Sequence, residues 1–144
     1  MQRLDAELKQ ALISRDQVRV DVLKMLKSAV NLEQKEKQDY DQSDFIATVR
    51  KQIKMRTDAI ELYMQAGRDD HAKKETAEVA VLEEFLPKQL TEPELLAVIQ
   101  EVAKTNDIAF EKQNMGRLIG LVVGKVGESA SKADIAKAIN SRLN

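Results

Sequence analysis

Apolar residues recur at steps of three and four along almost the whole chain, which is the spacing of amphipathic α-helices. Two such segments open the chain, and the polar run from Glu33 to Gln42 separates them from a third. Ser43 is expected to be the N-cap of that third helix, because serine is a preferred cap. The three apolar stripes are Leu4, Leu8, Ala11 and Leu12; Val18, Val22, Met25, Ala29 and Leu32; and Ile46, Val49, Ile53, Ile60 and Tyr63.

Glycine and proline predict where the next helices end. Gly67 follows the third stripe and is typical of a helix C-terminus. A fourth helix is expected from about Asp69, whose charge suits a helix N-terminus. It should end at Leu86, because Pro87 pushes the residue before it out of helical geometry. The apolar side of this helix comprises Ala72, Thr76, Val79, Leu82 and Leu86.

Three shorter helices are predicted after the proline. Thr91 and Glu94 form a T-x-x-E capping box that begins the fifth helix. The sixth covers residues 112–126 and is apolar on most sides, so we expect it at the buried centre of a three-helix cluster. Ser131 and Asp134 cap the seventh. The fold class is therefore all-α, with a four-helix N-terminal bundle at 1–90 and a small three-helix C-terminal domain at 91–144.

The composition narrows the class of protein. Hydrophobic residues make up 43%, charged residues 33%, and the formal net charge is −1, which describes a folded globular protein. Cysteine is absent, so disulfides and thiolate metal sites are excluded. We see no signal peptide and no apolar run long enough to span a membrane, and we expect a cytoplasmic protein. A nucleic-acid site would have to be a local basic patch.

No catalytic constellation is recognisable. His71 is the single histidine and follows Asp69 and Asp70, so it is expected on the surface rather than in a triad or a metal site. Glycine-rich phosphate loops are missing from the sequence. We therefore expect no catalytic residue, no metal and no small-molecule cofactor.

Arg56 falls on the apolar stripe of the third helix. A charge in that position must be paired or must reach the edge of the core. We expect a structural ion pair with a carboxylate of a neighbouring helix, and the candidates Asp21, Glu75 and Glu78 remain open. A contact with a ligand is the alternative.

The most unusual local feature is a row of glycines at Gly116, Gly120 and Gly124, which a spacing of four places on one side of a helix. Each glycine disfavours the helix by roughly 1 kcal/mol relative to alanine. Two explanations remain open: tight packing against another helix, or close approach of a phosphodiester backbone. Cations on or near this segment are Arg117, Lys125, Lys132 and Lys137.

Several stretches of the sequence form a pattern that covers essentially the whole chain. The most specific is Leu86-Pro87-Lys88-Gln89-Leu90 with its acidic lead-in. The other stretches are residues 22–29, Lys51-Gln52 with Arg56, Gly67-Arg68-Asp69-Asp70, Lys74-Glu75, Glu78-Val79, and Asn114-Met115-Gly116-Arg117-Leu118. Together these stretches resemble the YqeY family.

The resemblance implies a fold and a role. The YqeY family is similar to the C-terminal tail region of GatB, one of the proteins that make up the aspartyl/glutamyl-tRNA amidotransferase. This similarity implies a four-helix and a three-helix bundle and recognition of tRNA. The positions that match the RNA-facing ones are Gly116, Arg117, Gly120 and Lys125, followed by the turn at 127–132. Glu128 departs from the basic turn that the family usually has, and the positive charge moves to Lys132.

Three functions follow as hypotheses. The first is a non-catalytic tRNA-binding or tRNA-associated accessory protein. The second is a protein–protein adaptor with no RNA role. The third is participation in carbon–nitrogen ligase activity with glutamine as amido-N-donor, a label that such families often carry. The sequence offers no nucleophile, ATP site or ammonia channel for that reaction.

Overall fold

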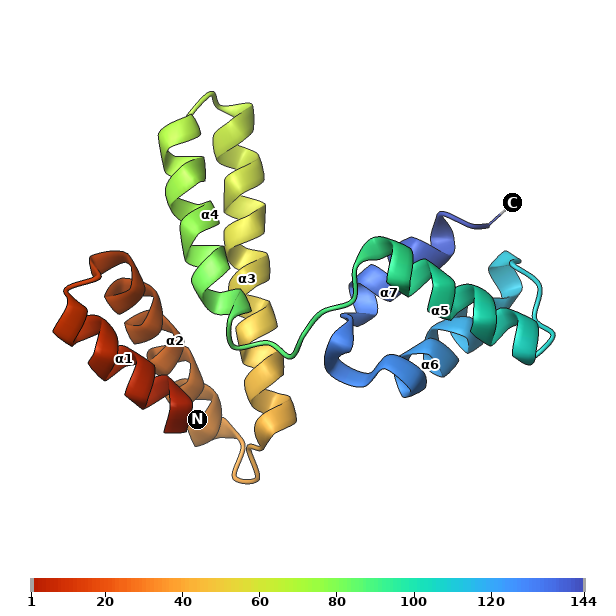
Figure 1. Ribbon diagram of the computed structural model, residues 1–144, viewed down its shortest axis with the longest axis horizontal. Helices are drawn as coiled ribbons and strands as arrows, with labels where there is room; N and C mark the ends of the chain where they lie inside the picture. Colours follow the sequence, from red (N-terminus) through yellow and green to blue (C-terminus); the bar gives the residue numbers. More distant parts are fainter. Residues whose placement is uncertain (1, 144) are drawn as a thin grey trace. The chain divides into compact units, whose positions relative to one another are not determined.

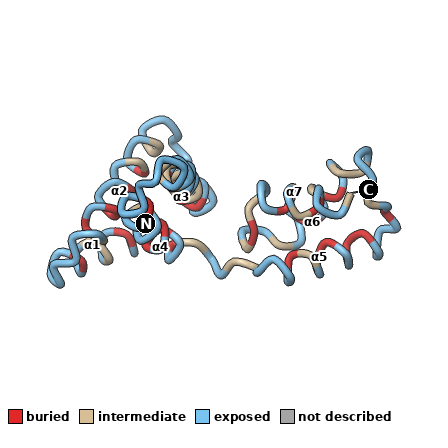
Figure 2. The backbone as a smooth tube through the Cα atoms, turned by 90° about the horizontal axis from the view of Figure 1, so that it is seen from above, coloured by how far each residue is buried: buried red, intermediate tan, exposed pale blue. Residues whose placement is uncertain are grey.

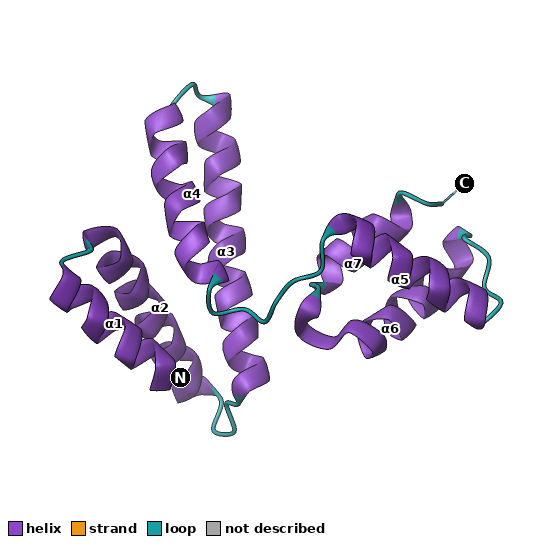
Figure 3. Ribbon diagram, in the orientation of Figure 1, coloured by secondary structure: helices purple, strands orange, loops and turns teal. Residues whose placement is uncertain are grey.

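The structure is a computed structural model, and it describes residues 2–143 (Figures 1 and 3). These residues form α-helices and two 3₁₀ turns without any strand, which confirms the all-α fold class. The elements are α1 (Gln2–Ser14), α2 (Gln17–Glu36), α3 (Gln42–Gln65), α4 (Asp69–Glu83), α5 (Glu92–Thr105), η1 (Lys112–Asn114), α6 (Met115–Val126), η2 (Gly127–Ser129) and α7 (Lys132–Asn140).

The chain divides into two compact units, Met1–Leu86 and Pro87–Asn144. The division lies four residues before the boundary expected at 90/91, and hydrogen bonds explain why. The Leu90 N–H donates to the Ser129 carbonyl over 2.8 Å, and the Gln89 side chain donates to the Glu128 carbonyl over 2.9 Å. The segment that precedes α5 is therefore attached to the C-terminal unit.

The N-terminal unit consists of two helical hairpins, α1–α2 and α3–α4. Their inner sides share one core, in which Leu23, Leu26 and Leu82 are almost completely buried. Phe45 and Phe85 meet edge to face, with ring centroids 6.2 Å apart. Figure 2 shows that the buried positions follow the sides of the helices that are turned toward each other.

The apolar stripe expected on α2 is wrong in part. Val18, Met25 and Leu32 are exposed, at 41%, 55% and 60%. They recur every seven residues and so form a stripe of their own, beside the one that is buried. Periodicity alone cannot tell two adjacent stripes apart. The residues of α2 that the core buries are Val20, Val22, Leu23, Leu26 and Val30.

The C-terminal unit packs α5, α6 and α7 around a second core. Ile99, Leu118 and Ile139 are among its fully buried members. The expectation that α6 is buried at the centre is wrong: the structure buries only Leu118 and Val122 of this helix. A cluster of three helices leaves one side of each open to solvent, and α6 follows that rule despite its apolar sequence.

Local signals fix most helix starts. Thr91 and Glu94 form the expected capping box. Ser131 caps α7 by accepting a hydrogen bond from the Asp134 N–H over 3.1 Å. The start of α3 differs from the prediction. Asp41, not Ser43, is the N-cap of α3, and its carboxylate and backbone N–H exchange hydrogen bonds with Asp44.

Three helix ends among residues 2–143 place a residue in the left-handed conformation. At the end of α1 this residue is Arg15, at φ 58°. At the end of α3 this residue is Gly67, at φ 71°, and the Arg68 N–H donates back to the Tyr63 carbonyl over 2.8 Å. This helix ending is a Schellman motif. At the end of α5 the same position is taken by Asp107, at φ 52°. Within residues 2–143 no helix is long and apolar enough to span a bilayer.

Candidate functional site

The glycine row lies on the side of α6 that faces solvent. Gly116, Gly120 and Gly124 are exposed, whereas Leu118 and Val122 are buried on the opposite side of the same helix. A rotation of about 100° per residue places the three glycines within one narrow strip. We call this strip, with Arg117 at its border, the glycine face.

Tight packing does not explain the glycines. A Cβ atom added at Gly116, Gly120 or Gly124 would meet no heavy atom of a neighbouring element within 4 Å. Alanine would fit at each position and would favour the helix. The first of the two explanations, packing against another helix, is therefore excluded for the helices that the structure describes in the C-terminal unit. What the glycines provide is a stretch of helix backbone that an incoming molecule can approach closely.

Apolar side chains flank the glycine face. Leu121 and Val123 are each 36% exposed. Arg117 follows Gly116 directly and precedes Gly120 by three residues, so its exposed guanidinium borders the row. An ordinary solvent-facing helix surface carries several charged or amide side chains. This one is nearly neutral, with a single cation beside bare backbone.

The other expected cations differ in their surroundings. The Lys125 ammonium lies 3.1 Å from the Glu101 carboxylate of α5, and both side chains are largely exposed. Such a surface pair is weak and can exchange partners. Lys132 lies in the first turn of α7, and Lys137 lies on the side of α7 away from buried Ile135. Only Arg117 and Lys125 come from α6 itself.

The turn after α6 is firmly held. Gly127 has φ 57° and ψ −126°, a backbone conformation that side chains rarely adopt. Gln89 and Leu90 bond to the next two carbonyls, as described above. Glu128 is exposed at this turn and places a negative charge near the end of the glycine face. The sequence pattern did not single out Gln89 as a partner of this turn, because the two positions are 39 residues apart.

Arg56 of the N-terminal unit forms a buried ion pair. Its Nε lies 3.1 Å from a carboxylate oxygen of Glu78 in α4, and the two side chains are only 6% and 11% exposed. Gln52 accepts a further hydrogen bond over 3.2 Å, and the thioether sulfur of Met25 lies 3.4 Å from Nη2. Among the three carboxylates left open by the sequence, Glu78 is the partner. The pair thus sits where α2, α3 and α4 meet.

A second carboxylate borders this pair. Burial, together with the negative charge of Glu78 and a hydrogen bond to it, raises the pKa of Glu75 above its ordinary value. Arg56 opposes the shift because its positive charge favours the ionised carboxylate. Glu75 is therefore a carboxylate beside the pair of Arg56 and Glu78, and its surroundings favour its protonated form.

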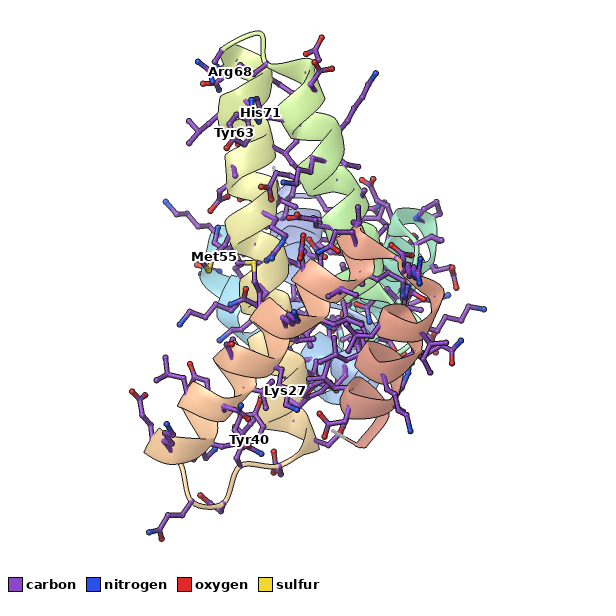
Figure 4. The ribbon with its side chains drawn as sticks, turned by 90° about the vertical axis from the view of Figure 1, so that its left-hand side faces the viewer. Lys27, Tyr40, Met55, Tyr63, Arg68 and His71 are labelled. Carbon is purple, nitrogen blue, oxygen red and sulfur yellow. The ribbon has the colours of Figure 1, made fainter. Side chains whose placement is uncertain are left out.

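His71 occupies the exposed start of α4, as expected. Its ring stacks on the Tyr63 ring of α3, with centroids 5.1 Å apart and planes 22° from parallel. Figure 4 shows the two rings side by side near the α3–α4 turn that carries Arg68. Neither a nucleophile nor a carboxylate completes a triad with this histidine among the interactions of residues 2–143. Within that range no group of three potential metal ligands comes together.

A comparison with protein-family models matches residues 1–143 to the family described as "Yqey-like protein". The match covers essentially the whole chain, both helical units included. A search of the curated proteins found no match to this sequence.

Proposed function

Because the chain belongs to the YqeY-like protein family, and because α6 exposes a row of glycines, we propose that it is a non-catalytic, tRNA-binding accessory protein. The glycine face is the proposed contact surface. The observation that carries the proposal is the open space above Gly116, Gly120 and Gly124. The resemblance of the family to the tail of the amidotransferase protein GatB supports tRNA as the class of RNA.

The chemistry of the glycine face suits a phosphodiester backbone. Phosphate contacts supply most of the affinity for nucleic acid and require cations at the surface. Arg117 provides a planar guanidinium that can bond a phosphate with two N–H groups. Lys125 is bonded to Glu101 only at the surface, so it can turn toward a phosphate. Bare helix backbone beside Arg117 permits a close approach.

Recognition by shape agrees with the composition. Aromatic residues make up 3% of the chain and tryptophan is absent, so an extended base-stacking surface is not available. Folded RNA is recognised largely through its shape, phosphates and 2′-hydroxyls. The glycine face, with no neighbouring atoms above its backbone, fits that mode. The acidic Glu128 lowers the expected affinity, since it repels phosphate at one end of the surface.

The test is fluorescence anisotropy of labelled bulk tRNA titrated with the pure protein at about 50 and 200 mM salt, a range over which phosphate contacts weaken measurably. We expect saturable binding that falls with salt. Arg117→Glu should weaken binding and reduce the salt slope. Lys73→Glu, an exposed charge reversal on α4 of the other unit, is the matched control and should bind like the wild type. No binding at low salt would refute the proposal.

A steric variant separates the glycine face from general charge. Gly120→Leu keeps every charge and replaces a poor helix former by a good one, so the helix should persist. Its side chain would nevertheless fill the open space above the backbone. Loss of tRNA binding in Gly120→Leu with an unchanged circular dichroism spectrum would support close approach to α6. Unchanged binding would remove the glycine face from the proposal.

A protein–protein adaptor is the second candidate, and one observation favours it. Met25, Met55 and Leu62 are 55%, 57% and 66% exposed on neighbouring helices of the N-terminal unit. Figure 4 shows the Met55 side chain at the edge of α3, away from the core. Exposed methionines are common on protein-binding surfaces because they adapt to different partners. A stable protein partner that survives nuclease and is lost in Met55→Lys and Leu62→Lys would favour this role over RNA binding.

Participation in glutamine-dependent carbon–nitrogen ligase activity is the third candidate. We propose that any such activity belongs to a partner protein, because the one histidine stacks on Tyr63 and the buried Arg56 bonds to Glu78. Incubation of the pure protein with glutamine, with and without tRNA and ATP, should release no glutamate. Steady release that depends on the protein would overturn this assignment.

A further inference from the structure

A shallow hollow of about 450 Å³, largely open to solvent, lies at the C-terminal end of α5, in the same unit as the glycine face. Gln100 and Lys104 of α5 and Asp107 just after the helix are among the residues that line it. Phe110 is the aromatic residue of the lining, and Ile108 and Ala109 complete the wall. The lining residues thus include one ring, one amide, one cation and one carboxylate, and none of them takes part in the glycine face.

Asp107 holds its carboxylate at this place by an unusual backbone conformation. Its φ of 52° is the left-handed conformation that favours glycine at the end of a helix. The Ile108 N–H donates to the Ala103 carbonyl over 2.9 Å, and the Asp107 N–H donates to the Lys104 carbonyl over 3.3 Å, so the ending is fixed. Glycine would serve this ending with less strain. Arg15 takes the same conformation after α1, so the conformation of Asp107 fixes where its side chain starts and does not by itself indicate a ligand.

The negative electrostatic potential at this end of α5 favours ligand groups that donate hydrogen bonds. The last carbonyls of a helix carry a partial negative charge, and the carboxylate of Asp107 adds a full one. Lys104 is exposed and provides a cation on the same wall. A ligand of the hollow should therefore present N–H groups to Asp107 and an anion to Lys104.

Phe110 adds a partly covered aromatic ring to the lining of the hollow. The ring is partly buried against the second core, and the Arg142 guanidinium lies over it with 5.4 Å between Cζ and the ring centroid. A planar ligand can lie against the part of the ring that lines the hollow. A flat ligand with N–H groups on one edge and a phosphate on the other side is a nucleotide.

We propose that this hollow binds the guanine base of an unpaired nucleotide in the bound RNA. Guanine alone among the four RNA bases presents two adjacent donors, N1–H and N2–H, on its Watson–Crick edge, and a carboxylate has two oxygens to accept them. The base lies against Phe110, and Lys104 contacts its phosphate. This inference rests on the proposed function for the source of the nucleotide, and a free guanine nucleotide shares the same chemistry.

The hollow and the glycine face are physically connected. The Asn114 side chain, at the start of α6, donates to the Ala109 carbonyl over 3.0 Å. The loop that lines the hollow is therefore bonded to the end of α6 that carries Gly116 and Arg117. An RNA strand that follows the glycine face toward Arg117 arrives beside this loop. One nucleotide turned out of its stack there would enter the hollow.

The test uses GMP, AMP and UMP as probes at millimolar concentration, each titrated into the full ¹⁵N-labelled protein. We expect GMP to shift the amide resonances of Asp107, Ile108 and Phe110, and to bind roughly tenfold more tightly than AMP or UMP, as is typical of a bidentate contact. Equal effects of the three nucleotides, or shifts confined to other residues, would overturn the inference.

Variants at Asp107 keep the fold and remove the proposed contact. Asparagine and glycine both tolerate the left-handed conformation, so Asp107→Asn and Asp107→Gly should fold normally. Both should lose the preference for GMP. Glu111→Gln, which alters a nearby exposed carboxylate bonded to Gln113, is the matched control and should retain it. If both Asp107 variants kept the preference, the carboxylate would have no role and the assignment would fail.

Labelled tRNA distinguishes the two sources of the base, an unpaired nucleotide of bound RNA and a free guanine nucleotide. Weaker tRNA binding in both Arg117→Glu and Asp107→Asn would support the function and the inference together. Weaker binding in Arg117→Glu with unchanged binding in Asp107→Asn would overturn the RNA base in the hollow and leave the function standing. GMP binding without any tRNA binding would overturn the proposed function and would make a free guanine nucleotide the ligand.

Discussion

Arg56 and Glu78 bond to each other over 3.1 Å in the interior of the N-terminal unit, where only 6% and 11% of their side chains are exposed. A buried ion pair is a poor source of stability, because both charges lose their hydration. Loss of one partner, however, leaves the other charge buried without compensation. Formation of the pair therefore adds little to the stability of the α3–α4 contact. Removal of one partner alone would lower that stability strongly.

Arg56→Met should destabilise the N-terminal unit by about 3–5 kcal/mol, because Glu78 would then be buried without a cation. Arg56→Met combined with Glu78→Leu should recover most of that loss, since two apolar side chains of similar size replace the pair. Urea denaturation followed by circular dichroism measures both variants. An equal loss in the single and the double variant would mean that packing, not charge, determines the effect.

Glu75 should make the stability of the N-terminal unit depend on pH. Burial and the neighbouring Glu78 raise the pKa of Glu75 in the folded protein above its ordinary value. The contribution of such a group is fully present below the ordinary pKa and is lost as the pH rises through the raised one. Glu75→Gln should therefore raise the melting temperature at about pH 8 and leave it unchanged at about pH 4.

The control for this prediction is Glu61→Gln on α3, an exposed carboxylate for which the same change should shift neither melting temperature. A gain in stability for Glu75→Gln that is equal at both pH values would contradict a titrating role. It would indicate a neutral improvement in packing or helix propensity instead.

Gly120→Ala should stabilise the C-terminal unit while it weakens tRNA binding. Alanine favours a helix interior by about 1 kcal/mol over glycine, and the added Cβ meets no neighbouring atom within 4 Å. Chemical denaturation should show a higher midpoint for this variant. Anisotropy with labelled tRNA should show a lower affinity, because the methyl group covers backbone. A variant that is more stable and binds equally well would separate the glycines from the function.

Asp107→Gly should stabilise the C-terminal unit by about 0.5–1 kcal/mol, because glycine adopts the left-handed conformation without strain. Asp107→Asn should be nearly neutral, since asparagine tolerates this conformation as aspartate does. Asp107→Val should destabilise the unit clearly, because a β-branched side chain does not. Thermal unfolding measures the series. A loss of stability in Asp107→Gly would show that the carboxylate makes a structural contact.

Local sequence signals predicted several helix ends of this fold, and the burial pattern less well. The capping box at Thr91, the glycine stop at Gly67 and the N-cap Ser131 depend on a few neighbouring residues, so a short motif contains the whole cause. The end of α4 is an exception, because the helix ends at Glu83, three residues before the end expected at Leu86. Asp41 was missed as the N-cap of α3, although Asp41 and Asp44 form the same kind of reciprocal cap. Two aspartates three residues apart are a less familiar form of that motif.

Tertiary features could not be read from the chain in the same way. Val18, Met25 and Leu32 have helical spacing, yet the core buries the neighbouring stripe, because the position of α3 and α4 decides which one is covered. The spacing of the three glycines of α6 predicted a shared side, but not that this side faces solvent. The hollow at Asp107 left no pattern, since its lining depends on how the loop after α5 folds back toward α6.

The exposed glycines of α6 also bear on how such a sequence changes over generations. Each could become alanine by one substitution without a steric conflict, and each change would add to stability. Compared with alanine, the three glycines together lower the stability of the domain by about 2–3 kcal/mol. The total stability of a domain is typically only about 5–15 kcal/mol. Random drift under selection for folding alone would erase such a row. Retention of the glycine row in diverging descendants would indicate selection that acts on the exposed backbone of α6.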